Sequence, residues 1–358
     1  MMTLAFIGDI FPGDEQLTAG FGIRTKTTDA LAARWTRNIT KTIGEADFIV
    51  GNLEAPLVES PRDACFCGHP RFAEILRDAG INVLHLANNH ILEHGAEGFR
   101  ETLATLRSQG LQTVGQLENG QPALLTLQKD GTTVCLGGFC DERVCTIENP
   151  ACYGALEETL VLETLERMKA TGADVLACIF HWGQEYVPIP SPEQRRLAHL
   201  LVDNGAHLVV GHHPHVIQPY ESYHGGHILY SLGNFCFDDV QSARFGKGMA
   251  ARISIDRGRI RDIRFSGVRV QDMACSDDLT APMPRRAFQR CFDGIQRRYA
   301  RLCRLPDESY GRRYARLHRC LHRRERLLMR VNIAYKLLDI RNRNKAQLLR
   351  NIRTYFLR

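Results

Sequence analysis

Three histidines follow one short apolar strand, and their spacing fits metal chemistry. The segment Leu208-Val209-Val210 runs directly into Gly211-His212-His213-Pro214-His215. Neutral imidazole donates a lone pair without carrying charge, so it is the commonest side-chain metal ligand. Enzymes of the α/β class often place such ligands where a strand ends. A histidine-rich surface turn is the structural alternative for this cluster taken alone, and the rest of the chain has to decide.

Polar residues also follow four other apolar strands. They are Asp9 after Leu4–Ile7, Glu54 after Phe48–Val50, Asn89 and His90 after Val83–Leu86, and His181 after Val175–Phe180. The carboxyl ends of parallel strands share one edge of a sheet, so we expect these groups to converge on one site. Taken singly, each group has an ordinary explanation: a helix cap, a loop acid, a turn or a core histidine. Their recurrence at successive strand ends favours a site.

The donor types indicate which metals would suit this site. Carboxylate, carboxamide and imidazole together suit Zn, Mn or Fe, and the absence of thiolates argues against a structural zinc. Two such ions about 3.5–4 Å apart can share a carboxylate and activate water for attack on phosphorus. We therefore expect divalent metal ions, two in number.

The elements that must position these residues alternate between strand and helix. Apolar periodicity predicts helices over residues 29–45, 72–78, 96–109, 157–170 and 192–204, each lying between predicted strands. This alternation by itself predicts a largely parallel sheet covered by helices, and hence an α/β fold. Asp130-Gly131 and Arg257-Gly258 each mark a hairpin.

Charge divides the chain of 358 residues into two regions. Residues 285–358 hold 20 Arg and 2 Lys against 5 acids, a balance of +17, and residues 1–284 have a balance of −11. We expect one domain over 1–272 and a basic α-helical tail over 284–358. In the tail, Phe288, Phe292, Ile295 and Tyr299 recur at helical spacing and predict a packed seam. The arginines are either a solvated face or an interaction surface.

Composition limits the cellular setting. No run approaches the roughly 20 apolar residues that span a bilayer. The N-terminus lacks the basic leader and cleavage site of a signal peptide, so a cytoplasmic protein is expected, with a peripheral membrane location open through the tail. Twelve cysteines without a CxxC pair are expected to be reduced structural thiols.

Six motifs together resemble one known family. They occur in family order over about residues 3–240: Gly8-Asp9-Ile10, Asn52-Leu53-Glu54-Ala55-Pro56, Ala87-Asn88-Asn89-His90, His181-Trp182-Gly183-Gln184-Glu185-Tyr186, Gly211-His212-His213-Pro214-His215 and Ser231-Leu232-Gly233-Asn234-Phe235. The set is similar to the CapA family of capsule and poly-γ-glutamate biosynthesis proteins, within the calcineurin-like metallophosphoesterase superfamily. The resemblance implies a layered α/β sandwich, here followed by an Arg-rich helical appendage.

The resemblance also implies a role for each residue. Glu54 would bridge two metals, although Asn52 also aligns with the bridging motif, and His90 would be the catalytic acid. The implied metal ligands are Asp9, Glu54, Asn89, His181, His212 and His215. The implied substrate contacts are Asn52, His213, Glu185 and Asn234. One departure concerns the first strand, where the superfamily has a histidine and this chain has Phe11.

Two functions of different class follow from these expectations. The first is a metal-dependent hydrolase that acts on a phosphoester or on an anionic polymer such as poly-γ-glutamate. The second is a non-catalytic accessory protein that retains the fold and works in a capsule-synthesis complex. Phe11, in place of a histidine, favours this second function, whereas His90 favours the hydrolase. Capsule-synthesis proteins and, through the tail, an anionic polymer or an acidic membrane surface are the expected partners. Nucleic acid is disfavoured because no nucleic-acid motif accompanies the arginines.

Overall fold

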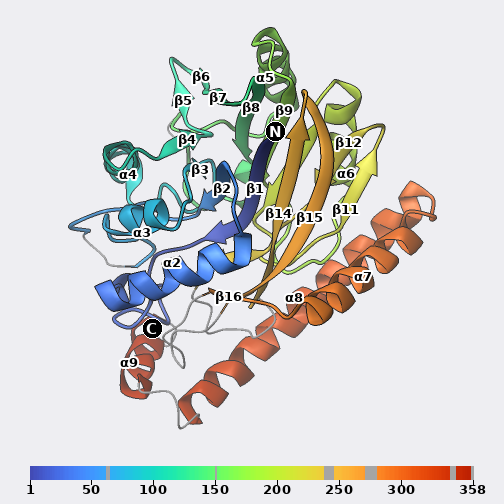
Figure 1. The fold of residues 1–358 in the computed structure, drawn as a ribbon. Helices are drawn as coiled ribbons and strands as arrows, with labels where there is room; N and C mark the ends of the chain where they lie inside the picture. Colours follow the sequence, from blue (N-terminus) through green and yellow to red (C-terminus); the bar gives the residue numbers. More distant parts are fainter. Residues whose placement is uncertain (62–64, 150, 238–245, 271–279, 339–343, 356–358) are drawn as a thin grey trace.

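Two β-sheets packed face to face form the centre of the molecule, and helices cover their outer faces (Figure 1). The computed structural model describes the whole chain except residues 62–64, 150, 238–245, 271–279, 339–343 and 356–358. The layered α/β sandwich implied by the resemblance is confirmed. The single, largely parallel sheet that alternation alone predicts is wrong, because the strands divide between two sheets of mixed pairing.

The first sheet has the strand order β16-β15-β14-β1-β2-β3-β4, with β13 also paired to β1. Strands β1 to β4 pair in parallel, and β14 to β16 add antiparallel pairs on the other side of β1. The strands are β1 (Met2–Ile10), β2 (Phe48–Leu53), β3 (Val83–His85), β4 (Gln112–Val114), β13 (Asn234–Cys236), β14 (Lys247–Asp256), β15 (Arg259–Val270) and β16 (Thr280–Pro282).

The second sheet has the order β11-β12-β10-β9-β8-β7, in which β8, β9, β10 and β12 are parallel. Its strands are β7 (Leu125–Lys129), β8 (Thr132–Cys140), β9 (Val175–His181), β10 (Leu208–His212), β11 (Tyr220–Tyr223) and β12 (Gly226–Leu229). A separate two-stranded ribbon pairs β5 (Leu117–Glu118) with β6 (Gln121–Pro122).

Alternating side chains of the central strands build three apolar layers. On β1, Leu4 and Phe6 face the second sheet, while Ala5 and Ile7 face the outer helices. On β9, Ile179 faces the first sheet and Phe180 faces outward. Successive residues of a strand point to opposite faces, so a strand buried on both sides is apolar at nearly every position. Every second residue of these strands therefore packs in the space between the two sheets.

The helices cover the two outer faces. On the first sheet they include α2, whose buried Trp35 packs edge-on against Phe72 of α3 at 5.8 Å between ring centroids. Helix α6 has a capping box in which Ser191 and Gln194 bond each other's backbone. The helices up to residue 203 are α1 (Ile23–Lys26), α2 (Asp29–Ile43), α3 (Phe72–Asp78), α4 (Gly95–Ser108), η1 (Glu142–Val144, a 3₁₀ turn), α5 (Glu158–Ala170) and α6 (Pro192–Asp203).

The tail forms the helices α7 (Arg285–Leu302), α8 (Asp307–Leu338) and α9 (Lys345–Tyr355). Helix α7 packs along β15, while α8 runs along the edge of the molecule toward α9 (Figure 1). The sequence pattern predicts separate helical stretches over residues 310–331 and 334–356, but α8 continues through the break between them to Leu338. None of the described helices combines the length and the apolar composition needed to cross a membrane.

Candidate metal centre

A β-bulge turns Asp9 into the space between the two sheets. Phe6 pairs with Val50 and Asp9 with Asn52, so β1 advances three residues while β2 advances two. The extra residue reverses the alternation and places Asp9 on the same face as Phe6 and Asn52. Gly8 lies in this bulge, where a Cβ atom would stand 1.9 Å from the carbonyl oxygen of Gly233. Only glycine fits there without a shift of the backbone.

In the second sheet, side chains alternate between the two faces without a bulge up to the last residues of β9 and β10, which are histidines. His181 ends β9 two residues after Ile179, and His212 ends β10 two residues after Val210, so both imidazoles face the first sheet. Nδ1 of His212 lies 3.1 Å from Oδ1 of Asp9. Nε2 of His181 lies 2.8 Å from Oδ1 of Asn89, which follows β3. The groups therefore meet where two sheets face each other, and the expected single sheet edge is wrong.

Glu54 lies at the middle of this cluster. Its carboxylate oxygen Oε1 is 3.5 Å from Nε2 of His181 and 3.6 Å from Nε2 of His215. Ligand atoms lie within 4.8 Å of one another in two groups, Asp9 with Glu54 and His181, and Glu54 with His213 and His215. Glu54 belongs to both groups. A carboxylate shared in this way has the arrangement that a bridging ligand needs.

The two histidines of the second group differ in their backbone and their partners. His213 has φ of 93° and His215 has φ of 55°, a left-handed geometry that is costly for residues with a Cβ atom. This geometry breaks the strand alternation after His212 and brings His213 round to the same cluster. Nδ1 of His215 lies 2.8 Å from Oδ1 of Asn234, which leaves Nε2 toward Glu54.

Asn52 is buried behind Asp9 and uses both ends of its amide on protein groups. Its Nδ2 donates to Oδ1 of Asp9 at 2.9 Å, and its Oδ1 accepts from Asn88 at 3.3 Å. Oδ1 also lies 3.1 Å from Nδ1 of His85. With its amide committed in this way, Asn52 holds Asp9 in place. Of the two candidate bridging residues, Glu54 is the one with an oxygen within 3.6 Å of both His181 and His215.

His90 lies beside the cluster, 21% exposed at its side chain, and bonds Glu93 three residues later. Its Nδ1 is 2.8 Å from Oε1 of Glu93, so a proton on Nδ1 is held by the carboxylate and Nε2 is left for another partner. The imidazole stacks on Phe66 at 5.4 Å. Phe11, where the resemblance implies a histidine, packs edge-on against His90 at 6.0 Å and stacks on Phe237 at 4.9 Å. An apolar wall therefore replaces a donor there.

The electrostatics follow from complete burial. Burial lowers the pKa of His181 well below its usual range and that of His213 to about 4, so both are neutral and free to donate a lone pair. Burial, followed by the charges of Asp9 and Glu185, raises the pKa of Glu54 well above its usual range. Burial opposes ionisation of Asp9 too, but its hydrogen bond with His212 and the charge of that histidine outweigh it, and its pKa is lowered.

Glu185 stands at the rim of the cluster, exposed to solvent. Desolvation by its neighbours acts to raise the pKa of its carboxyl, but the nearby His215 and His213 outweigh this and lower it. Asn234, on β13, lies within the cluster against His215. Of the four residues expected to contact substrate, Glu185 is thus at the opening, whereas Asn52, His213 and Asn234 are buried.

Three participants were not predicted from the sequence. His85 lies inside the apolar run of β3, and its ring stacks on His212 at 6.2 Å. Asn88 bonds the backbone of Leu53 at 2.7 Å, and Glu93 holds His90. His85 carries a detectable signal, since it ends a strand on the inward face as His181 does. For Glu93 the only such signal is its position three residues after His90, a spacing that places two side chains on one face of a helical turn.

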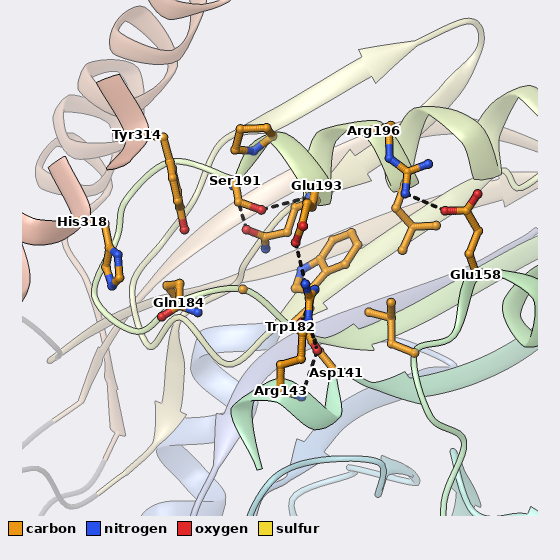
Figure 2. A pocket seen from close by; sticks show the side chains of 15 residues that line it. Asp141, Arg143, Glu158, Trp182, Gln184, Ser191, Glu193, Arg196, Tyr314 and His318 are labelled. Carbon is orange, nitrogen blue, oxygen red and sulfur yellow. Dashed lines mark hydrogen bonds and ion pairs between the residues drawn. The ribbon is translucent and has the colours of Figure 1, made fainter. Parts of the chain in front are cut away.

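A separate cavity of about 690 Å³ lies on the other side of β9 (Figure 2). Trp182 lines it, and because Trp182 directly follows His181, the last residue of β9, it faces the opposite side. Arg143 pairs with Asp141 and with Glu193 at 2.8 Å each on one wall. Tyr314 of α8 reaches into it (Figure 2). Among the residues that line it in the described part of the chain, none is a predicted ligand of the candidate metal centre.

Comparison with known proteins gives a match over most of the sandwich. Residues 3–239 match the family model described as "Bacterial capsule synthesis protein PGA_cap". The capsule biosynthesis protein CapA of Bacillus anthracis is 31% identical over 255 residues, which cover 66% of this chain and 60% of that protein. The PGA biosynthesis protein CapA of Bacillus subtilis is 30% identical, with 66% and 64% covered. The chain thus spans less than two thirds of the length of these curated relatives.

Solved structures were also compared. The 5'-nucleotidase precursor from Thermus thermophilus is 11% identical, with a TM-score of 0.46, and the match covers 84% of this chain and 59% of that one.

Proposed function

Because the chain belongs to the bacterial capsule synthesis protein PGA_cap family, we propose that it is a metal-dependent hydrolase of capsule biosynthesis. The proposed substrate is an anionic polymer of the poly-γ-glutamate type, in line with the name of the Bacillus subtilis relative, or a phosphoester. The proposed location is the cytoplasm. Partner proteins of capsule synthesis belong to the same proposal.

One observation carries the proposal. Glu54 is fully buried, and neither of its carboxylate oxygens has a hydrogen-bond partner among the residues that the structure describes. A buried carboxylate without hydrogen bonds is costly, and proteins keep one where a cation compensates it. The neutral imidazoles of His181 and His213 complete a donor set that suits such a cation. The residues therefore fit divalent metal ions.

The donor groups indicate how two ions would be held. Asp9, Glu54 and His181 would hold one, with Asn89 beside His181, and Glu54, His213 and His215 would hold the other. His212 belongs to neither group and instead bonds Asp9, so His213 fits the second ion better than His212. Mn, Zn and Fe suit this mixture of oxygen and nitrogen donors. Bound divalent ions polarise the scissile group and activate water.

The chain's own residues supply orientation and a proton. Asn234 accepts from Nδ1 of His215 and so fixes which nitrogen faces Glu54, the usual arrangement behind a metal-binding histidine. His90 is the proposed general acid, because Glu93 holds its Nδ1 and leaves Nε2 for the leaving group. Glu185 at the rim would meet the substrate first.

An accessory protein that retains the fold is the second candidate, and one observation favours it. Phe11 is 1% exposed and packs against Phe237. Asp9 is therefore the metal donor that the end of β1 supplies, and aromatic rings lie where a second donor would be expected. A centre with fewer donors binds its ions more weakly. Such a protein would bind the polymer without cleaving it.

Metal analysis of purified variants, combined with a hydrolysis assay, tests the proposal. We expect about two divalent ions per wild-type chain by mass spectrometry and turnover of polyglutamate or a phosphodiester. His90→Ala should keep its metal and lose about 10²–10⁴-fold in rate, since it removes a proton donor only. His215→Ala should lose metal and activity together.

His224→Ala, at an exposed histidine outside the cluster, is the matched control and should resemble wild type. Equal loss of metal in His90→Ala and His215→Ala would contradict the assigned roles. Full metal content without turnover of either substrate class would favour the accessory protein.

A further inference from the structure

The second half of α8 carries an apolar stripe on its outside. Leu327, Val331, Tyr335 and Leu338 follow one another at steps of four, four and three, which places them on one face of a helix. Their side chains are 63%, 56%, 56% and 81% exposed. They account for most of the large apolar side chains exposed in the described part of the chain. Soluble surfaces seldom gather such residues in one row.

The opposite face of the same helical segment is already occupied. Ile333 and Leu337 pack against Leu17, Phe21 and Leu348, which belong to the loop after β1 and to α9. At the other end of α8, the hydroxyl of Tyr310 donates to the carbonyl oxygen of Pro190 at 2.7 Å. The helix is thus held at both ends. The exposed stripe lies on the face away from Ile333 and Leu337, and α8 runs along the edge of the molecule (Figure 1).

Arginines surround the stripe. Every tail arginine whose side chain the structure describes is exposed: Arg285, Arg286, Arg290, Arg297, Arg298, Arg301, Arg304, Arg312, Arg313, Arg316, Arg319, Arg323, Arg324, Arg330, Arg350 and Arg353. Arg323 and Arg324 lie in the turn before Leu327, and Arg330 lies between Leu327 and Val331. Residues 285–358 carry a balance of +17. The tail therefore combines a strong positive field with uncovered apolar side chains.

This combination distinguishes between two anionic partners. A soluble polyanion would pair with the arginines but would leave Leu327, Val331, Tyr335 and Leu338 in water. A bilayer with anionic lipids satisfies both, because the apolar side chains enter the acyl boundary while the arginines reach the phosphates. Tyrosine and the long arginine side chain are both suited to that boundary.

We propose that the second half of α8 lies in the plane of an anionic membrane surface, with the stripe inserted and the flanking arginines on lipid phosphates. This binding surface is independent of the metal centre, so it stands or falls separately from the hydrolase proposal. The lipid headgroups supply the negative charge, and the hydrocarbon boundary supplies the cover for the apolar row.

Vesicle co-sedimentation of the full chain tests the surface. Vesicles of phosphatidylcholine with about a third phosphatidylglycerol should bind the protein, pure phosphatidylcholine should bind it weakly, and raised salt should release part of it. Tyr335→Trp should show a blue-shifted emission on binding, because both native tryptophans, Trp35 and Trp182, are buried and respond little. Emission that stays unchanged while the protein sediments would place Tyr335 outside the bilayer and overturn the proposal.

Two sets of variants separate the apolar and charged contributions. Replacing the four stripe residues by Gln should raise the lipid concentration for half-binding by at least roughly tenfold, since the inserted area is lost. Arg323→Gln, Arg324→Gln and Arg330→Gln combined should weaken binding more than Arg285→Gln, Arg286→Gln and Arg290→Gln combined. Both triple variants remove the same net charge from exposed sites. Equal weakening by the two triples would show a general charge effect and overturn the assignment to α8.

Two further outcomes also contradict the proposal. If the stripe pairs with a second copy of the chain, analytical ultracentrifugation will show a wild-type dimer and a monomeric stripe variant, with no effect of lipid. If soluble polyglutamate binds as tightly as the vesicles and the stripe variant binds it equally well, the arginines serve a polymer and the membrane has no part. A thermal melt of the stripe variant that matches wild type confirms that the fold is intact.

Discussion

The protonation of single residues at the centre depends on what each carboxylate meets. Glu54 and Asp9 are both fully buried and lie in the same cluster, yet the pKa of Glu54 is raised and that of Asp9 is lowered. The difference arises from the partners of each carboxylate. The carboxylate of Asp9 accepts from Asn52 and lies 3.1 Å from His212, whereas the carboxylate oxygens of Glu54 have no hydrogen bond to any residue that the structure describes. One carboxylate is stabilised by the protein itself, and the other is the one for which we propose an external cation.

This difference predicts opposite effects of neutralising the two acids in metal-free protein. The pKa of Glu54 is raised in the folded protein, so at pH values above its unfolded pKa the ionisation of Glu54 costs increasing stability. Glu54→Gln should therefore raise the melting temperature at pH 8 and change little at pH 4. The pKa of Asp9 is lowered in the folded protein, so ionised Asp9 stabilises the fold at pH values above its unfolded pKa. Asp9→Asn should therefore lower the melting temperature at pH 8.

Thermal melts in chelator across this pH range provide the measurement. The expected shifts are on the order of a few degrees, since about 1 kcal/mol moves the midpoint of a domain larger than 150 residues by about 2–4 °C. A Glu54→Gln protein that melts below wild type at pH 8 would mean that Glu54 is compensated within the chain. The Glu54 carboxylate would then need no bound cation.

At the scale of elements, the helices of the tail are parts of the core. Phe288 and Phe292 of α7 are buried in the layer between the sheets, and Phe292 packs on Phe265 of β15 at 5.0 Å. Tyr299 donates to Oε2 of Glu221 on β11 at 2.7 Å. Removing residues 285–358 would therefore uncover apolar sheet surface, and truncation cannot isolate the function of the arginines.

Phe288→Ala and Phe292→Ala should each destabilise the protein by about 3–5 kcal/mol, the usual cost of deleting a buried phenylalanine. Urea unfolding followed by circular dichroism measures this cost. Arg286→Ala on the exposed side of the same helix should stay within about 0.5 kcal/mol of wild type. Similar midpoints for all three variants would show that α7 does not contribute to the core.

Most elements are predictable from the sequence because their apolar periods are strong. Helix α6 was bounded by a proline at its start and a glycine after its end, and β9 and β10 were recognised as apolar runs. Strand order was not accessible, because pairing such as β14 with β1 joins segments about 250 residues apart. Reading the site as one sheet edge failed for the same reason.

Some side-chain positions were also beyond the sequence. Asp9 faces inward only because of the bulge at Gly8, and His213 joins the cluster only through its positive φ. The bulge depends on a close contact with distant backbone, that of Gly8 against Gly233. The residue types at the strand ends were nevertheless sufficient to predict that carboxylates and imidazoles would be the donors.

At the scale of the whole molecule, the candidate metal centre joins the two sheets. Asp9 and Glu54 come from the first sheet and the segment after it, whereas His181, His213 and His215 come from the second. An ion held by both would link the halves of the sandwich. Metal binding and global stability should therefore be coupled.

Adding Mn²⁺ or Zn²⁺ to chelator-treated protein should raise the melting temperature. Binding at about 100 times the dissociation constant contributes about 2.7 kcal/mol. His181→Ala in the second sheet and Asp9→Asn in the first should each remove most of the shift, because each deletes a donor from the same group. A variant in one sheet that keeps the full shift would show that the ion is held by the other sheet alone.

The contact between α9 and the loop after β1 has a consequence for synthesis of the chain. Nδ2 of Asn351 donates to the carbonyl oxygens of Leu17 and Ala19 at 3.0 and 2.9 Å, and Leu348 is buried against Leu17 and Phe21. On the ribosome, Leu17 is made 334 residues before Asn351. That corner of the molecule therefore stays uncovered while the intervening residues are made, with Leu17 and Phe21 open to nascent-chain chaperones until residue 351 has emerged.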